Sequence, residues 1–433
     1  MEATKTTLLL GRLVDIDHEG QLRDRPGHGL LWNREGRLLH IAPADQLLSS
    51  HPHADVIDCS DGLIVPGAVD CHIHFPQTRA LARQAPALLD WLDTHIWPEE
   101  RRYKDPAYAD NMADLFLKEL FRHGTTTALV FGSQFVHAND ALFQRAHAHR
   151  MALITGLTLQ DRHTHPDLEL NREGAEQGSL ALLQRWHGKE RLGYCVTSRF
   201  SPACTDDQLA LCGELLQAHP DCWFQTHINE SLSEIEWVRQ LFPNSRDYLD
   251  TYEKHGLLGP RSLFAHSIHT SEDELRRMGE SQSVVVHCPS SNSFLGSGAF
   301  SWQAHQEHEV RIGVGTDVGA GVTFSMWREM GHAYLVQMQR TTRHPLPGAA
   351  MLKAMTLDGA RALSLDEEIG NFEVGKWADA VHVKASNPAL HPNPSTTEEL
   401  EQWLFTQAML GDPATVRQTF VAGESVFCGK SQG

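Results

Sequence analysis

Short apolar runs recur along the middle of the chain, and a polar turn and then a stretch of helical periodicity follow each run. Apolar or β-branched runs of this length predict strands, and apolar residues at every third or fourth position predict amphipathic helices. We count eight such runs, at 68–71, 125–131, 152–157, 192–197, 222–226, 262–265, 283–286 and 311–315. Strands that alternate with helices form parallel sheets. Eight βα units over about 250 residues predict an α/β protein with a (β/α)8 barrel, the TIM-barrel fold.

Both ends of the chain have a different pattern, with short alternating strands and few helical stretches. The strands are predicted at 7–10, 30–33, 37–41 and 56–58, and then at 380–383, 419–421 and 424–427. Neither half has enough strands to be stable alone. We therefore expect residues 1–65 and 372–433 to form one composite β-sandwich domain, and residues 66–371 to form the barrel.

Charge and composition narrow the classes of partner. The chain has 37 Lys and Arg against 55 Asp and Glu, so its formal net charge is −18. A charge of this sign disfavours binding to a nucleic-acid backbone or to an anionic membrane. No apolar stretch is long enough for a transmembrane helix, and the first residues do not resemble a signal peptide. The eight cysteines form no C-x-x-C pair, so we expect a reduced, cytoplasmic protein.

Histidine is abundant, with 27 residues, and the pattern H-x-H occurs four times. Three of the four pairs lie in polar loops or in a helical stretch, namely 51/53, 147/149 and 163/165. Only His72 and His74 close an apolar run, which begins at residue 63. Residues two apart in a strand point to the same side. Both imidazoles should therefore enter the mouth of the barrel, where barrel enzymes have their active sites.

Further polar residues end other predicted strands. These are His227, His266, His287 and Asp317. A catalytic zinc ion commonly has three protein ligands and a water molecule, so partners for His72 and His74 are expected among them. Glu230 lies three residues after His227, and in a helical turn both would share one side. A carboxylate beside a metal-bound water is a suitable proton carrier.

Six separated motifs resemble the amidohydrolase superfamily, in the form seen in guanine deaminases. They are PGAVDCHIHFPQ at 66–77, SRFSPAC at 198–204, QTHINE at 225–230, HCPSSN at 287–292, GTDV at 315–318 and GNFEVGKWADA at 370–380. The resemblance covers nearly the whole chain. Within this resemblance, guanine is indicated as the substrate mostly by Gln77, Arg199 and Phe200.

The resemblance implies a metal site, a reaction and a substrate. His72, His74, His227 and Asp317 would bind one Zn²⁺ per subunit. The catalytic residues would be Glu230, Asp317 and His266, with Glu230 as proton shuttle. The residues next to guanine would be His74, Gln77, Arg199, Phe200, His227, Glu230 and Asp317. The reaction would convert guanine and water into xanthine and ammonia, and the protein would be a homodimer.

Two other interpretations stay open at this point. A sibling enzyme that deaminates another amino-purine, a pyrimidine or a triazine would use the same metal ligands. A non-catalytic assembly protein would have the barrel without the ligands, and the presence of the whole set argues against it. His163, His165, His269 and His287 have no role in the scheme.

Overall fold

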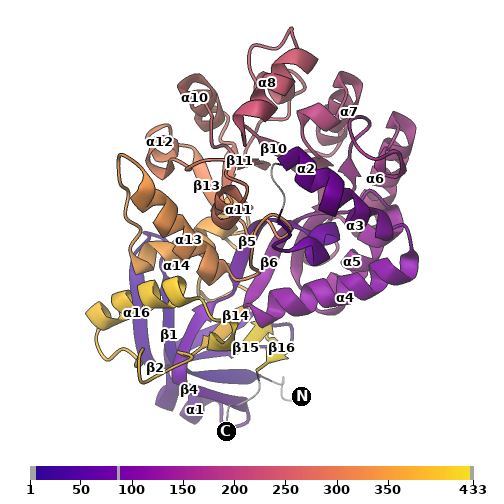
Figure 1. Cartoon of the computed structure of the whole chain (residues 1–433). Coiled ribbons are helices and arrows are strands. Elements are labelled where there is room, and N and C mark those ends of the chain that lie inside the picture. Colours follow the sequence, from indigo (N-terminus) through magenta and orange to yellow (C-terminus); the bar gives the residue numbers. More distant parts are fainter. Residues whose placement is uncertain (1–5, 85–87, 430–433) are drawn as a thin grey trace.

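The structure, a computed structural model, describes residues 6–84 and 88–429 (Figure 1). Its centre is a parallel barrel in which neighbours follow the order β13-β12-β11-β10-β9-β7-β6-β5. The strands are β5 (Ala68–His74), β6 (Thr125–Phe131), β7 (Ala152–Gly156), β9 (Leu192–Ser198), β10 (Trp223–Ile228), β11 (Ser262–His266), β12 (Val284–His287) and β13 (Arg311–Val314), with the short β8 (Thr158–Leu159) beside β9. All eight predicted runs are strands, so the predicted barrel is confirmed.

Hydrogen bonds between the segment after β13 and β5 bring the two ends of the barrel sheet together. The backbone N–H of Asp317 donates to the carbonyl oxygen of His72 at 2.8 Å. Thr316 donates from its hydroxyl and its backbone to the buried carboxylate of Asp70, at 2.6 and 3.1 Å. These bonds place the first and the last functional segments of the barrel side by side.

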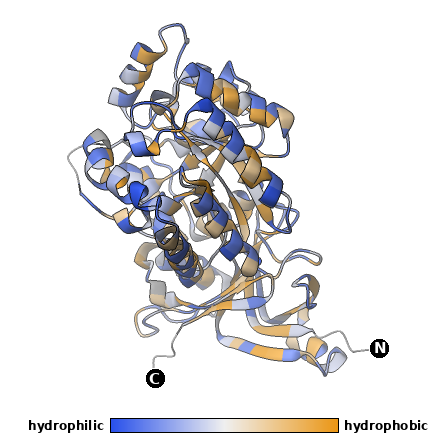
Figure 2. Ribbon diagram, turned by 90° about the vertical axis from the view of Figure 1, so that its right-hand side faces the viewer, coloured by the Kyte–Doolittle hydropathy of each residue, from blue (hydrophilic) through white to orange (hydrophobic). Residues whose placement is uncertain are grey.

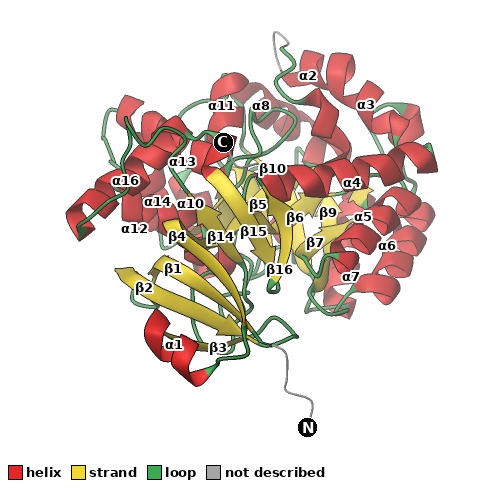
Figure 3. Cartoon of the chain, turned by 90° about the horizontal axis from the view of Figure 1, so that it is seen from below, coloured by secondary structure: helices red, strands yellow, loops and turns green. Residues whose placement is uncertain are grey.

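Helices surround the barrel (Figure 3). They are α2 (Leu88–Trp91), α3 (Trp97–Arg102), α4 (Pro106–Arg122), α5 (Val136–Ala148), α6 (Arg172–Trp186), α7 (Asp206–Ala218), α8 (Leu232–Leu241), α9 (Asp250–Glu253), α10 (Glu272–Glu280), α11 (Pro289–Phe294), α12 (Trp302–Glu307), α13 (Met326–Gln339), α14 (Gly348–Met355) and α15 (Leu357–Ala362). In α4, Asp105 caps the first turn, and Met112, Phe116 and Leu120 recur at the helical period and are buried. Figure 2 shows this pattern as helices with mixed colours around mainly apolar strands.

A seven-stranded sheet lies below the barrel and contains both ends of the described chain (Figure 1). Its order is β16-β15-β14-β4-β1-β2-β3, and β14 pairs antiparallel with β4. The strands are β1 (Thr7–Ile16), β2 (Leu22–Trp32), β3 (Leu38–Pro43), β4 (Asp55–Pro66), β14 (Ala380–Val383), β15 (Val416–Val421) and β16 (Glu424–Cys428), and α1 (Ala44–Ser50) packs beside them. The prediction that the chain ends form one separate sheet domain is confirmed. The boundaries 1–65, 66–371 and 372–433 stay our proposal.

The two faces of β4 belong to two different cores. Leu63 and Val65 join the large apolar cluster that includes barrel residues. Ile64, which points the other way, joins a second cluster within the sheet domain. Because side chains alternate between the two faces of a strand, one face of the sheet packs against the barrel and the other forms the core of the sheet domain.

The apolar run from residue 63 to 71 is divided at Gly67 between β4 and β5, so the predicted strand at 68–71 is the first part of β5. A Cβ atom at Gly67 would lie 2.0 Å from Oγ1 of Thr126, so only glycine fits this junction. The tail, predicted as strands alone, also contains α16 (Thr397–Leu410), which packs against α13 and α14. Within the described residues, no helix has both the length and the apolar character that crossing a membrane requires.

Candidate active site

Three histidines and one carboxylate bring their ligand atoms together at the carboxyl ends of the barrel strands. Nε2 of His74 lies 3.2 Å from Nε2 of His72, 3.3 Å from Nε2 of His227 and 3.1 Å from Oδ1 of Asp317. The same Asp317 oxygen lies 3.3 Å from Nε2 of His72. One imidazole nitrogen carries at most one proton, so it cannot make three hydrogen bonds at once. Two ligand atoms that are each about 2.0–2.1 Å from one metal ion lie about 2.9–3.4 Å apart, and the observed distances fit such a shared ion.

The surroundings fix the orientation of the three rings. Nδ1 of His227 contacts the carbonyl oxygen of Arg199 at 2.5 Å, which turns Nε2 toward the common point. The ring of Phe131, at the end of β6, packs against all three imidazoles, with centroids 4.6–5.0 Å apart. The three rings are therefore held before any ligand arrives.

The electrostatics favour the protonation states that a metal requires. Burial lowers the pKa of His74 and, more strongly, that of His227, so their rings are neutral. Burial alone would raise the pKa of Asp317, but hydrogen bonds from His72 and His74 hold that pKa well below its usual range. Neutral imidazole and ionised carboxylate are the forms that bind divalent cations.

Glu230 lies directly beside this cluster and is only 5 % exposed. Burial, together with the negative charges of Glu234 and Asp317, raises its pKa well above the usual range. The hydroxyl of Ser297 donates to Oε1 of Glu230 at 3.1 Å, and His269 contacts the carbonyl oxygen of Ser297 at 2.8 Å. A buried carboxyl group that favours its protonated form can deliver a proton to a bound base.

His266 ends β11 on the other side of Glu230, with Nε2 3.6 Å from Oε2 of Glu230. The side-chain amide of Asn292 donates to Nδ1 of His266 at 2.9 Å. Burial lowers the pKa of His266 to about 3, so the ring is neutral. Its backbone φ is +78°, and that of Asp317 is +48°. Such values are costly for residues other than glycine and cluster at functional sites.

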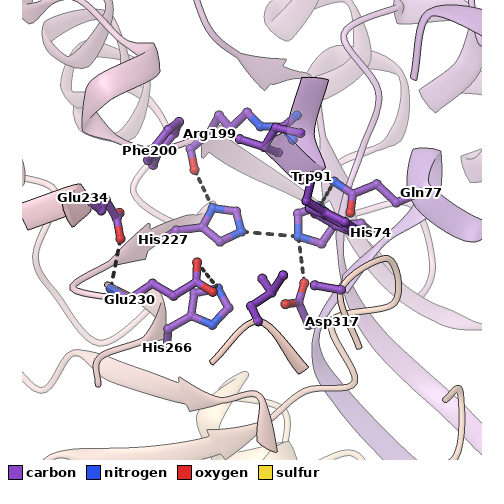
Figure 4. A pocket seen from close by; sticks show the side chains of 13 residues that line it. His74, Gln77, Trp91, Arg199, Phe200, His227, Glu230, Glu234, His266 and Asp317 are labelled. Atoms are coloured by element: carbon purple, nitrogen blue, oxygen red, sulfur yellow. Dashed lines mark hydrogen bonds and ion pairs between the residues drawn. The ribbon is translucent and has the colours of Figure 1, made fainter. Parts of the chain in front are cut away.

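A cavity opens over the cluster (Figure 4). Its lining comprises His74, Gln77, Trp91, Leu92, Arg199, Phe200, His227, Glu230, Glu234, His266, Leu295, Asp317 and Ala320. Polar groups therefore lie on opposite sides of the cavity, and apolar side chains complete the wall. This is the usual composition of a small-molecule site.

The structure brings every predicted site residue into this region. His72 lies just beneath the cavity, as a member of the ligand cluster. Gly315 and Gly319, which follow β13, permit the close packing: a Cβ atom would lie 2.6 Å from Cβ of His72 and 2.1 Å from Oε1 of Gln77, respectively. The individual roles of these residues stay predictions.

The remaining histidines of the sequence analysis lie elsewhere. His287 ends β12 as expected, but its ring stacks on Phe300 at 4.3 Å and does not line the cavity. His163 and His165 lie in a loop, where His165 accepts a hydrogen bond from the backbone of Asp167 at 3.1 Å. Among the cavity-lining residues that the structure describes, none comes from this H-x-H pair.

Several residues of the site were missed, among them Trp91, Glu234 and Glu100. Trp91 lines the cavity, and its indole nitrogen has no hydrogen-bond partner among residues 6–84 and 88–429. Glu234 accepts hydrogen bonds from the backbone of Glu230 and the hydroxyl of Tyr248, at 3.0 and 2.6 Å. Glu100 is fully buried against Arg199. Of these three, Glu234 alone had a sequence signal, because Ser231 and Glu234 form a capping box.

Known proteins resemble this chain in both sequence and architecture. The model of the Amidohydrolase family matches residues 63–426. The guanine deaminase of Escherichia coli is 38% identical over 92% of this chain and 91% of its own length. A probable guanine deaminase of Deinococcus radiodurans is 41% identical over 92% of both chains.

Solved structures agree with these relatives. The E. coli guanine deaminase superposes with a TM-score of 0.92 and 35% identity, over 98% of this chain and 100% of that one. The guanine deaminase of Bradyrhizobium japonicum superposes with a TM-score of 0.94 and 33% identity, over the same shares. With the fold, the ligand cluster and the match over nearly its whole length, the chain belongs to the amidohydrolase family and, within it, to the guanine deaminases.

Proposed function

We propose that the protein is a guanine deaminase, which converts guanine and water into xanthine and ammonia. The observation that supports this most directly is the position of buried Glu230 beside four converging ligand atoms, with a cavity over both. A proton carrier next to a metal site is the combination that hydrolytic deamination requires. The named relatives support guanine as the substrate.

His72, His74, His227 and Asp317 would hold one divalent metal ion per subunit. Three imidazoles and a carboxylate suit zinc. When bound, the metal supplies Lewis-acid activation of a water molecule, whose pKa it lowers. The ligand set is supported by the position of Nε2 of His74, which lies 3.1–3.3 Å from the ligand atom of each of the other three residues.

The chain's own groups would move the protons. Asp317 accepts a proton from the attacking water, and His266 donates a hydrogen bond to the water oxygen. The protonated Glu230 gives its proton to ring nitrogen N3, which makes C2 electrophilic. The oxygen of the attacking water forms a bond to C2. The C2 amino group then takes the proton that Asp317 holds, the C2–N bond breaks, and ammonia leaves. The ionised Glu230 takes the proton of the new C2 hydroxyl, which becomes the carbonyl of xanthine. The raised pKa of Glu230 and the lowered pKa of Asp317 support these opposite assignments.

Arg199, Gln77 and Phe200 would hold the purine. A guanidinium group has donors only, so Arg199 suits the O6 carbonyl of guanine and disfavours adenine, which has an amino group there. Phe200 contributes apolar surface at the cavity wall. The cytoplasmic location and the homodimer remain predictions.

Ammonia release from a panel of bases tests the proposal. We expect guanine to react far faster than adenine, cytosine or a triazine, by up to ~10⁴-fold, because the wrong base leaves buried polar groups unpaired. Elemental analysis of the same preparation should give one metal ion per chain. Faster release from adenine or from a triazine would reject guanine as the substrate and favour the sibling deaminase. A metal-free protein without any turnover would favour the assembly protein.

A further inference from the structure

Glu100 joins the two side chains that are proposed to recognise the purine edge. It lies on α3 and is fully buried. Its two oxygens each accept a hydrogen bond of 2.8 Å from Nη1 of Arg199. Oε1 also accepts from Nε2 of Gln77 at 3.1 Å, and Oε2 from Nε2 of Gln134 at 3.4 Å. A single carboxylate thus contacts residues from three different segments at the cavity wall.

The carboxylate determines which way the Gln77 amide faces. An ionised carboxylate only accepts hydrogen bonds, so the amide nitrogen must point to Glu100 and the amide oxygen away from it. Nδ1 of His74 lies 3.3 Å from the same nitrogen, and a proton on Nδ1 would favour the opposite orientation. The shorter bond to the charged carboxylate outweighs that contact, because charge-assisted hydrogen bonds are roughly twice as strong as neutral ones. The atom left for a ligand is therefore the oxygen of Gln77.

The backbone after β13 leaves room for this oxygen. A Cβ atom at residue 319 would lie 2.1 Å from it, and Gly319 has φ +128°, which suits glycine alone. On the other side, the bonds from Arg199 to Glu100 all begin at Nη1, so Nε and Nη2 stay as donors for the ligand. The wall thus presents an acceptor and a donor group close together.

We infer that Glu100 is a positioning residue that gives the wall this polarity and so selects a lactam edge, an N–H next to a carbonyl. The inference rests on the proposed function and extends it. In guanine, N1–H faces the Gln77 oxygen and O6 faces Arg199. 2,6-Diaminopurine has the same reactive amino group at C2 but the reverse edge, an acceptor at N1 and a donor at position 6. Glu100 touches no reacting atom, and it acts through its two neighbours.

The test compares guanine with 2,6-diaminopurine in wild-type protein and in Glu100→Gln. The amide of the variant can donate as well as accept, so Gln77 is free to turn and Arg199 loses its two-point anchor. We expect kcat/KM for guanine to fall at least ~30-fold, mainly through KM, while that for 2,6-diaminopurine falls less. The ratio of kcat/KM for guanine to kcat/KM for 2,6-diaminopurine should therefore fall at least ~10-fold. Glu100→Asp, which keeps the charge but is one methylene shorter, should restore part of the ratio.

Two further measurements make the outcome decisive. Glu329→Gln is a matched control, because Glu329 is also fully buried but accepts its hydrogen bond from Ser290, outside the cavity wall. It should leave the ratio unchanged. If Glu100→Gln does not fold, the ratio in Glu100→Asp decides, since the shorter side chain must lose at least one of the contacts. A wild-type ratio in a folded Glu100 variant with its full metal content would overturn the inference. Absence of guanine turnover in the wild type would instead reject the proposed function.

Discussion

Replacement of Glu230 by Gln separates proton transfer from every other role of this side chain. The amide has the same shape and still accepts the hydrogen bond that Ser297 donates at 3.1 Å. It cannot carry the proton that the raised pKa of Glu230 keeps available. Loss of a general acid–base group costs about 10²–10⁴-fold in rate, which corresponds to about 2.7–5.4 kcal/mol of activation free energy at about 1.36 kcal/mol per tenfold. We expect kcat for guanine to fall within this range.

The assay is ammonia release at saturating guanine, with metal content measured on the same sample. Metal should stay bound, because the Glu230 carboxyl is not among the four converging atoms. Glu236→Gln is the matched control: it is the same change on α8, at a side chain that is 59% exposed, and it should leave kcat unaltered. A Glu230→Gln protein with kcat within about fivefold of the wild type would remove Glu230 from the mechanism. Loss of its metal would show that Glu230 is a ligand.

Three further substitutions test other parts of the structure. His227→Ala should lose both metal and activity, while His163→Ala should keep both. Metal content is measured by elemental analysis, and full occupancy in His227→Ala would contradict the ligand set. Gly319→Ala should raise KM for guanine at least ~10-fold, because the new Cβ atom collides with the side-chain oxygen of Gln77 at the cavity wall. Gly375→Ala is the control: Gly375 also has a positive φ, but a Cβ atom there would have no neighbour within 4 Å, so KM should not change. Burial lowers the pKa of His287 well below its usual value, so it is neutral when folded and gains a proton on unfolding below about pH 6.5. This residue alone should therefore lower the free energy of unfolding of the metal-free protein by about 1.4 kcal/mol per pH unit below that pH. Urea titrations should show a pH dependence of this free energy that is weaker by one proton in His287→Leu than in the wild type. The same pH dependence in both proteins would disprove the argument.

The four proposed metal ligands could be predicted from the sequence, because in each case a side chain that suits a metal ion lies at the end of a predicted strand. His72 and His74 close an apolar run, and His227 and Asp317 follow others, so a barrel places them at one mouth. The same reasoning included His287, which also ends a strand. A strand end shows which edge of the barrel a residue occupies but not whether its side chain turns inward or, as here, stacks on Phe300.

Glu100 could not be found in this way. It belongs to the run Glu99-Glu100-Arg101-Arg102, which has the composition of a solvated helix face. Glu99 and Arg102 do pair with each other, at 3.0 Å, and Arg101 pairs with Asp167 at a partly exposed site. Only the packing of α3 over the barrel mouth buries one of these four charges. Its partner Arg199 is 99 residues away, and no local pattern encodes that contact.

The place of β14 between β4 and β15 matters for the chain while it is being synthesised. In the finished sheet Pro66 is opposite Ala380, which the ribosome adds 314 residues later. At about 5–20 residues per second, the edge of β4 waits roughly 15–60 s for its partner. An open strand edge is a template for pairing with other chains. A chain that ends before Ala380 keeps this edge open permanently. We therefore expect the truncated chain to aggregate into inclusion bodies. This is expected even though the eight barrel strands and the four proposed metal ligands all lie before residue 380.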